Sequence, residues 1–175
     1  SVRNTQHILF KNLLSPTISA VSFWICGYTF AYGNDCDDES ANMFAGSECY
    51  WGLGSGMWLQ DAAANSSADS DVPQADLRWY SLWFFQWAFC ATASTIVSGA
   101  VAERISLSLY AIITAALSLL IYPVVAHWAW APDGWANPAK TKPLGEPRLF
   151  DVGAVDFAGG GVVHMVGGLV ALLSA

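Results

Sequence analysis

Charged residues leave four long apolar stretches in this chain, and this pattern predicts its architecture. No Asp, Glu, Lys or Arg lies between Lys11 and Asp35, between Arg78 and Glu103, between Arg104 and Asp133, or after Asp156. Each stretch approaches or exceeds the roughly 20 residues that a helix needs to cross a bilayer. We therefore predict an all-α, polytopic transmembrane helical bundle with four spans, at about 13–33, 79–101, 106–127 and 157–175.

Composition supports a membrane protein. Apolar residues make up 54% of the chain and charged residues only 12%, with a mean hydropathy of +0.39. A soluble domain carries about twice that charged share. The net charge of −7 does not indicate a soluble acidic protein, because most of the fourteen acidic residues fall in one loop, 34–77. The spans and loops of residues 1–175 read as one membrane domain.

Basic residues predict the orientation of the spans. Arg3 and Lys11 precede the first span, and Arg104 lies in the short link between the second and third. The positive-inside rule places both segments in the cytoplasm, which makes the acidic loop 34–77 extracytoplasmic. Cys36 and Cys49 lie in that loop, where a disulfide is permitted but spacing alone does not establish one. We expect an integral protein of the plasma membrane, with an organelle membrane as the alternative.

The two ends of the chain bear on its completeness. It begins with Ser1 rather than Met, shows no signal sequence, and stops within or at the end of a span. We expect an internal piece of a longer membrane protein. The alternative is a natural chain of about half the usual length.

The fourth stretch carries the most unusual chemistry. Asp156 is a natural N-cap, whose carboxylate accepts from free backbone N–H groups and opposes the helix dipole. On a helix from 157, small residues and a single imidazole, His164, share one face at spacings of three and four. Glycine in a helix is costly unless something approaches closely. We predict that His164 stands on a strip of close contact, and an ionisable side chain in a span is a functional candidate.

The second and third stretches add aromatic rings and a polar group. Phe85 and Phe89 are four residues apart and share a helix face. Gln86 is polar at shallow membrane depth and must find a partner. Pro123 should kink the third span, and for His127, which follows it, we favour a packing role.

Five separated runs resemble the ammonium transporter (Amt/Mep/Rh) family, in its eukaryotic form. They are 85–89 (FQWAF), 96–104 (IVSGAVAER), 122–128 (YPVVAHW), 131–135 (APDGW) and 156–164 (DFAGGGVVH). The resemblance implies that the four spans correspond to helices 2–5 of an eleven-helix fold built as two inverted halves, usually a homotrimer with one pore per subunit. It also implies transport of ammonium or ammonia, with methylammonium as an analogue.

The same resemblance implies roles for five residues. Phe85, Phe89 and Trp130 match the outer cation-recruitment vestibule, and Phe89 also matches a gate phenylalanine of the pore. His164 matches the first of two pore histidines, which relay the proton. Asp156 matches the acid that holds the signature helix in shape. The second histidine, the second gate phenylalanine and the other half of the fold have no counterpart in this sequence.

Chemical reasoning supports this assignment. Aromatic ring faces attract a small cation by up to about 2 kcal/mol when it is desolvated. A bare ammonium ion crosses a dry apolar passage only at large cost, so a neutral imidazole is suited to accept or relay its proton.

Two alternatives to transport fit parts of this sequence. The first alternative is a non-conducting relative that acts as a sensor or as a structural membrane subunit of a larger complex. A second is a haem or pigment protein that uses His164 or His127 as axial ligand. An enzyme is disfavoured, because no nucleophile–base pair, metal-ligand spacing or phosphate-binding glycine loop is present. We expect the bilayer as a partner, and no catalytic residue, metal, cofactor or nucleic acid.

Overall fold

The computed structural model describes residues 5–32, 74–131, 134–138 and 149–175, and its regular structure there is entirely helical. The helices join into four rods. In chain order they are α1 (Thr5–Ser22) with η2 (Phe23–Gly27) and α2 (Tyr28–Tyr32); α4 (Gln74–Val101); α5 (Leu107–Ala116) with η4 (Leu117–Ile121) and α6 (Tyr122–Trp130); and η6 (Gly160–Met165) with α7 (Val166–Ser174). A single 3-10 turn, η5 (Leu149–Asp151), precedes the last rod.

Three of the rods are long and apolar enough to cross a membrane. They are Thr5–Tyr32, Ser81–Val101 and Leu107–Trp130, and Gly160–Ser174 is a shorter apolar helix. The predicted all-α membrane fold is therefore confirmed for the described residues. The acidic loop and both of its cysteines, Cys36 and Cys49, lie outside the described residues.

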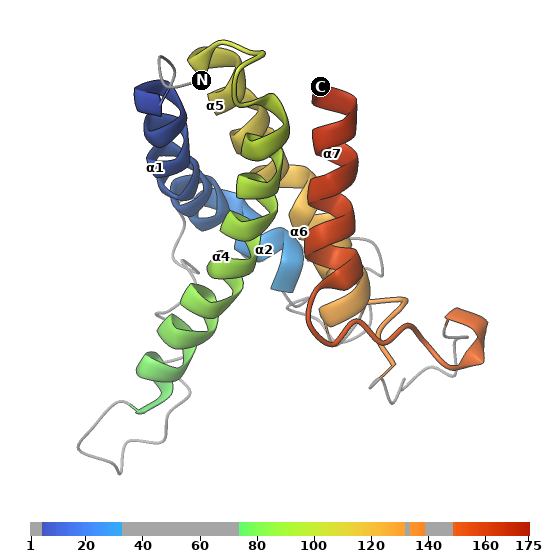
Figure 1. Cartoon of the computed structure of the whole chain (residues 1–175). Helices are drawn as coiled ribbons and strands as arrows, with labels where there is room; N and C mark the ends of the chain where they lie inside the picture. The colour runs from blue at the N-terminus through green and yellow to red at the C-terminus, as the bar shows by residue number, and fades with distance from the viewer. Residues whose placement is uncertain (1–4, 33–73, 132–133, 139–148) are drawn as a thin grey trace.

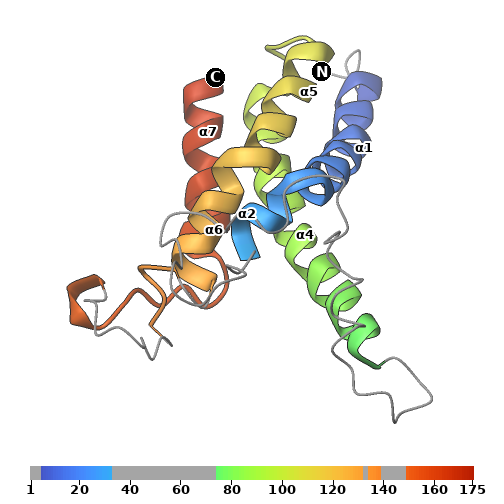
Figure 2. The same ribbon diagram turned by 180° about the vertical axis from the view of Figure 1, so that it is seen from behind.

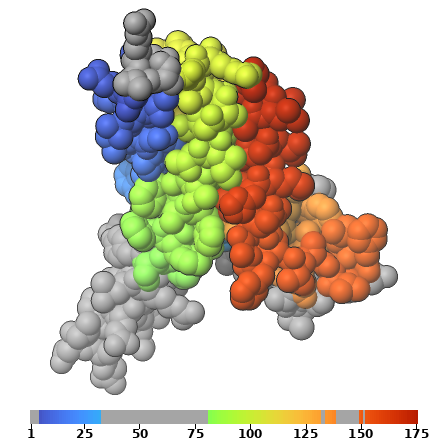
Figure 3. Space-filling model, in the orientation of Figure 1, coloured from blue at the N-terminus to red at the C-terminus, as the bar shows by residue number. Residues whose placement is uncertain are grey.

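The rods pack side by side around α4, which contacts α1 on one side and α7 on the other. Figure 1 shows that α1 begins, α7 ends, and the 102–106 link turns at the same end of the bundle. The view from behind shows the α5–η4–α6 rod crossing the back of α4 (Figure 2). In Figure 3 the surface of α4 lies between those of α1 and α7.

The first helix begins earlier than the expected 13–33. The helix already starts at Thr5, and it carries Lys11, from the expected cytoplasmic lead-in, into the bundle. Its side chain is only 3% exposed, and Nζ donates to the carbonyl oxygens of Ala102 (3.0 Å) and Ile105 (2.8 Å). These two bonds satisfy backbone carbonyls in the link that follows α4. The lysine thereby holds the start of α1 against the 102–106 link.

Small polar side chains form the contact between α1 and α4. Ser15, Ser19 and Ser22 are buried along one face of α1, spaced three and four residues apart. Ser19 Oγ donates to Cys90 Sγ (3.5 Å), and Ser98 Oγ donates to Asn12 Oδ1 (2.8 Å). Small residues let helix backbones approach closely where lipid supplies no hydrophobic driving force. These small polar side chains therefore let α1 and α4 pack closely.

The third rod departs from regular α geometry before Pro123. The five residues of η4 form a π-helical turn, in which the N–H of Tyr122 bonds to the carbonyl of Leu117. Proline has no N–H and its ring crowds the preceding turn, and a wider π turn accommodates both effects. On the first rod, η2 packs against η4, and a Cβ added to Gly27 would collide with the carbonyl oxygen of Ser118. Glycine at this position is therefore required by the close approach.

The fourth helix begins at Gly160, not at 157. Gly159 adopts a left-handed backbone (φ 81°), which interrupts helical geometry and which glycine tolerates best. The predicted face of small residues also lies at the edge of the contact with α4. Gly167 and Ala171 are buried in that contact, whereas His164 and Gly168 are exposed.

Candidate functional site

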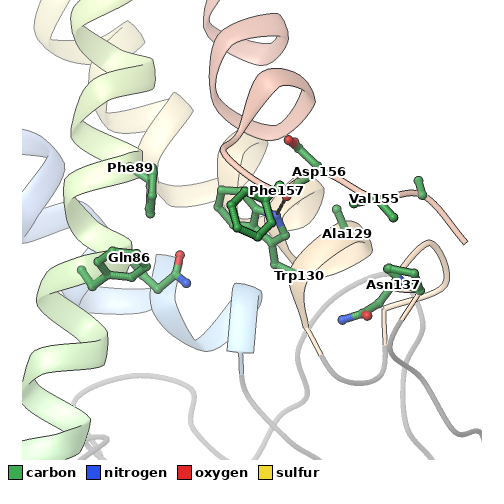
Figure 4. A pocket seen from close by; sticks show the side chains of 11 residues that line it. Gln86, Phe89, Ala129, Trp130, Asn137, Val155, Asp156 and Phe157 are labelled. Atoms are coloured by element: carbon green, nitrogen blue, oxygen red, sulfur yellow. Dashed lines mark hydrogen bonds between the residues drawn. The ribbon is translucent and has the colours of Figure 1, made fainter.

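Three aromatic side chains from two rods meet at the end of the bundle opposite the 102–106 link. The rings of Phe85 and Phe89, one turn apart on α4, are 4.9 Å apart at 89°. The ring of Phe89 lies 5.4 Å from that of Trp130, the last residue of α6. We call Phe85, Phe89 and Trp130 the aromatic cluster (Figure 4). The structure thus brings together the three residues that the family resemblance implies for cation recruitment.

Trp130 is fixed by the segment that precedes the fourth helix. Its Nε1–H donates to the backbone oxygen of Asp156 at 2.7 Å. A Cβ added to Gly159 would lie 3.4 Å from Cη2 of the indole, so the backbone at Gly159 passes close to the ring edge. One hydrogen bond and one close contact therefore hold the indole in place.

The carboxylate of Asp156 caps the N-terminus of the fourth helix. Its Oδ2 accepts from the backbone N–H groups of Gly161 (3.0 Å) and Val162 (2.7 Å), two of the donors that a helix N-terminus leaves free. A Cβ on Gly161 would lie 3.2 Å from the same oxygen, so glycine gives the carboxylate room. Asp156 lies three residues before Gly159, and the backbone between them is not helical. Its carboxylate can therefore turn back onto the first N–H groups of the helix.

An open cavity of about 360 Å³ lies beside the aromatic cluster. Most of its lining is apolar, and four residues, Gln86, Trp130, Asn137 and Asp156, bring polar side-chain groups to it. The lining comprises Phe85, Gln86, Phe89, Ala129, Trp130, Asn137, Pro138, Ala154, Val155, Asp156 and Phe157. Figure 4 shows the aromatic residues of α4 on one side and Trp130, Asp156 and Phe157 on the other.

Two loop segments form the outer wall of this cavity. The N–H of Ala136 donates to Trp128 O (2.9 Å), and the N–H of Ala154 donates to Ala136 O (2.7 Å). Asn137 Nδ2 donates to the carbonyl of Ala131, just beyond the end of α6 (2.7 Å). These bonds tie the loop after α6 and the strip before the fourth helix into one wall.

His164 does not line this cavity. It lies in the π-helical turn η6, where its own N–H and that of Val163 both bond to the carbonyl of Gly159 at 2.9 Å. Its side chain is exposed and makes no hydrogen bond to another described residue. The face that presents His164 is therefore uncovered by the described parts of this chain. Single π turns inside α-helices occur frequently at functional sites.

His127 takes the packing position that the sequence favours for it. The imidazole is fully buried, and its Nδ1 lies 2.9 Å from the carbonyl oxygen of Ala31. It links α6 to α2 at the outer end of the first rod. No group of three or more His, Cys, Asp or Glu side chains that could hold a metal ion lies among the described residues.

The arrangement suits a small cation. Ring faces attract cations within about 6 Å of their centroids, and the attraction grows as water is excluded. The half-buried Asp156 adds a negative charge to the cavity wall, and a charge in a low-dielectric cleft raises the local concentration of counter-ions.

The sequence did not indicate the outer wall of the cavity or the burial of Lys11. Asn137, Pro138 and Ala154 reach the cavity only through loop contacts that no periodicity reveals. Gly134 and Gly153 were the available signal, because a Cβ on either would collide with neighbouring backbone. Lys11 gave no local signal, since its burial depends on carbonyl groups more than 90 residues away.

Comparison with known proteins gives consistent results. The chain is 39% identical over 173 residues to ammonium transporter 1 member 1 of Arabidopsis thaliana, and 37% identical over 167 residues to ammonium transporter 3 of Dictyostelium discoideum. These alignments cover 99% and 95% of this chain, but 29% and 30% of the relatives. A solved structure named Sensor Amt Protein superposes with a TM-score of 0.65 at 30% identity, over 93% of this chain and 33% of that one.

The chain therefore spans about a third of the length of the proteins it matches, and the match is continuous. A sequence model of the Ammonium Transporter Family covers residues 1–175. The order of the helices, the aromatic cluster and the Asp156 cap all lie within that region. By sequence and by fold, this chain belongs to the Ammonium Transporter Family.

Proposed function

We propose that this chain forms part of a membrane transporter for ammonium or ammonia. The observation that carries the proposal is the aromatic cluster, three rings from α4 and α6 beside the Asp156 carboxylate, in a member of this family. The relatives are named as ammonium transporters, not as enzymes. Since the chain spans about a third of their length, the full-length protein is the unit to be tested.

The aromatic cluster would recruit the cation at the outer mouth. Ammonium is small and carries one charge, so ring faces partly replace the water it loses on entry. Phe89 lies between Phe85 and Trp130, and in our proposal its ring also gates the way inward. Asp156 would act indirectly, since its Oδ2 is engaged by two backbone N–H groups while its backbone oxygen holds Trp130.

His164 would handle the proton in the next step. An ammonium ion cannot enter an apolar passage without a large desolvation cost, whereas neutral ammonia can. A neutral imidazole accepts a proton on one ring nitrogen and can pass one on from the other. His164 is exposed on the fourth rod, where segments beyond this chain could complete a passage around it. The family resemblance also suggests a homotrimer in the bilayer, with one passage per subunit.

The decisive experiment is uptake of methylammonium by the full-length protein carrying His164→Ala. We expect uptake to fall about a hundredfold or more, the scale of losing one acid–base group, at unchanged abundance in the membrane. His7→Ala is the matched control, since it removes an exposed imidazole from the start of α1. Wild-type rate and selectivity in His164→Ala would remove this residue from the mechanism.

A sensor is the second candidate, because the matched solved structure is named Sensor Amt Protein. A sensor would keep the aromatic cluster and bind ammonium without net uptake. The uptake assay separates the two candidates when it is paired with a binding measurement. Saturable ammonium binding to the purified wild-type protein, without methylammonium uptake in cells, would favour the sensor.

A further inference from the structure

One polar atom on the cavity wall lacks a partner. The side-chain oxygen of Gln86, Oε1, is buried and makes no hydrogen bond with any described residue. A buried carbonyl without a donor costs free energy comparable to a lost hydrogen bond, and native structures rarely leave one unsatisfied. Such an atom calls for a donor that reaches it from the cavity.

Gln86 is placed to meet a ligand of the aromatic cluster. It precedes Phe89 by three residues on α4, so the side chains of Gln86 and Phe89 leave the helix on the same side. Figure 4 shows the carboxamide pointing from α4 towards the side of the cavity that carries Trp130 and Phe157. A cation held against the rings would therefore lie beside the Gln86 carboxamide.

The other polar side chains of the lining already have partners. Trp130 Nε1 donates to the Asp156 backbone, Asp156 Oδ2 accepts from two N–H groups, and Asn137 Nδ2 donates to Ala131. Among the described residues that line the cavity, Gln86 Oε1 is the buried side-chain acceptor without a donor.

We propose that Gln86 is a specificity-determining residue, whose side-chain oxygen accepts a hydrogen bond from an N–H of the cation on the aromatic cluster. Ring faces attract a cation without regard to its hydrogen-bonding groups, whereas a carbonyl oxygen rewards a directed N–H donor. The pair therefore favours ammonium and small primary ammonium ions over cations without N–H groups. This inference rests on the proposed transport of ammonium.

The test compares Gln86→Leu and Gln86→Glu in the full-length protein, using methylammonium uptake. Gln86→Leu keeps the approximate size but removes the acceptor, so KM should rise about tenfold while kcat stays within about twofold. Gln86→Glu keeps an acceptor oxygen at the same reach, so its KM should return to the wild-type value or fall below it. Phe84→Leu is the matched control, because that exposed neighbour does not line the cavity.

Each result separates a hydrogen bond to the cation from a packing role. A KM within twofold of wild type in Gln86→Leu would overturn the assignment, as would equal KM increases in Gln86→Leu and Gln86→Glu. A fall in kcat without a change in KM would indicate a packing role and overturn it as well. If the wild-type protein takes up no methylammonium, the proposed function fails together with this inference, whereas failure of the variants alone leaves transport intact.

Discussion

Trp130 serves two purposes through two parts of one side chain. The indole N–H bonds to the Asp156 backbone and fixes the orientation of the ring, while the ring itself contacts Phe89 and lines the cavity. A substitution can therefore remove the ring, or it can remove only the bond that orients it. The two losses have different consequences for a cation that binds to ring faces.

We predict that Trp130→Leu lowers the apparent affinity for ammonium about tenfold, because a cation–π contact contributes up to about 2 kcal/mol. Trp130→Phe keeps a ring face but loses the bond to Asp156, so its loss should be smaller. Concentration-dependent uptake in cells that express the full-length protein measures both effects. Trp128→Leu is the control, because that indole packs on Trp135 and does not line the cavity. Unchanged affinity in Trp130→Leu would refute a role for this ring in recruitment.

The packing of α4 against α7 depends on one glycine of an adjacent pair. A Cβ on Gly167 would lie 2.9 Å from the backbone oxygen of Ala93, whereas a Cβ on Gly168 would meet nothing within 4 Å. The two glycines are adjacent on α7, but only Gly167 faces α4. This difference gives a matched pair of substitutions on one element.

We expect Gly167→Ala to lower the thermal unfolding temperature of the purified full-length protein, since α7 must move away from a backbone atom of α4. Gly168→Ala should leave that temperature unchanged or raise it, because alanine favours a helix by about 1 kcal/mol relative to glycine. Unfolding in detergent, followed by tryptophan fluorescence, compares the two variants. Equal unfolding temperatures would show that α4 and α7 pack more loosely than the structure indicates.

At the scale of the whole molecule, the link at 102–106 and the end of α6, whose last residue is Trp130, lie at opposite ends of the bundle (Figure 1). The positive-inside rule assigns the link, which carries Arg104, to the cytoplasm. Phe157, 98% exposed, would then face the outside.

A cysteine at position 157 should therefore react with a membrane-impermeant maleimide on intact cells, and a cysteine at position 103 only after the cells are permeabilised. The parent protein without either introduced cysteine gives the background. Labelling of position 103 on intact cells would reverse the orientation, and the proposed direction of recruitment with it.

The helices and the shared face of Phe85 and Phe89 could be predicted from the sequence, because gaps in charge and spacings of three or four residues are local signals. Trp130 was expected beside them only through the family resemblance. The start of the fourth helix could not, since it depends on the left-handed backbone of Gly159. The burial of Lys11 and the outer wall around Asn137 arise from contacts between distant segments. The π turn before Pro123 lies between these cases, because the sequence indicates a distortion but not its form.

The late start of the fourth helix bears on how membrane voltage acts on this protein. Arg104 Nη1 donates to the backbone oxygen of Ala175, which places that end of α7 level with the 102–106 link. The six residues of η6 and nine of α7 rise about 22 Å, less than the roughly 30 Å hydrocarbon core. With the 102–106 link at the cytoplasmic face and this rod along the membrane normal, as we propose, the non-helical strip at Asp156 would lie below the outer membrane surface. Exposed backbone at that depth must be wetted by the cavity it lines. Electrolyte reaching this far shortens the distance over which the transmembrane potential drops. In the proposed mechanism, an ion docked on Trp130 would sense little of that field, and the electrical work would fall on the step beyond Phe89.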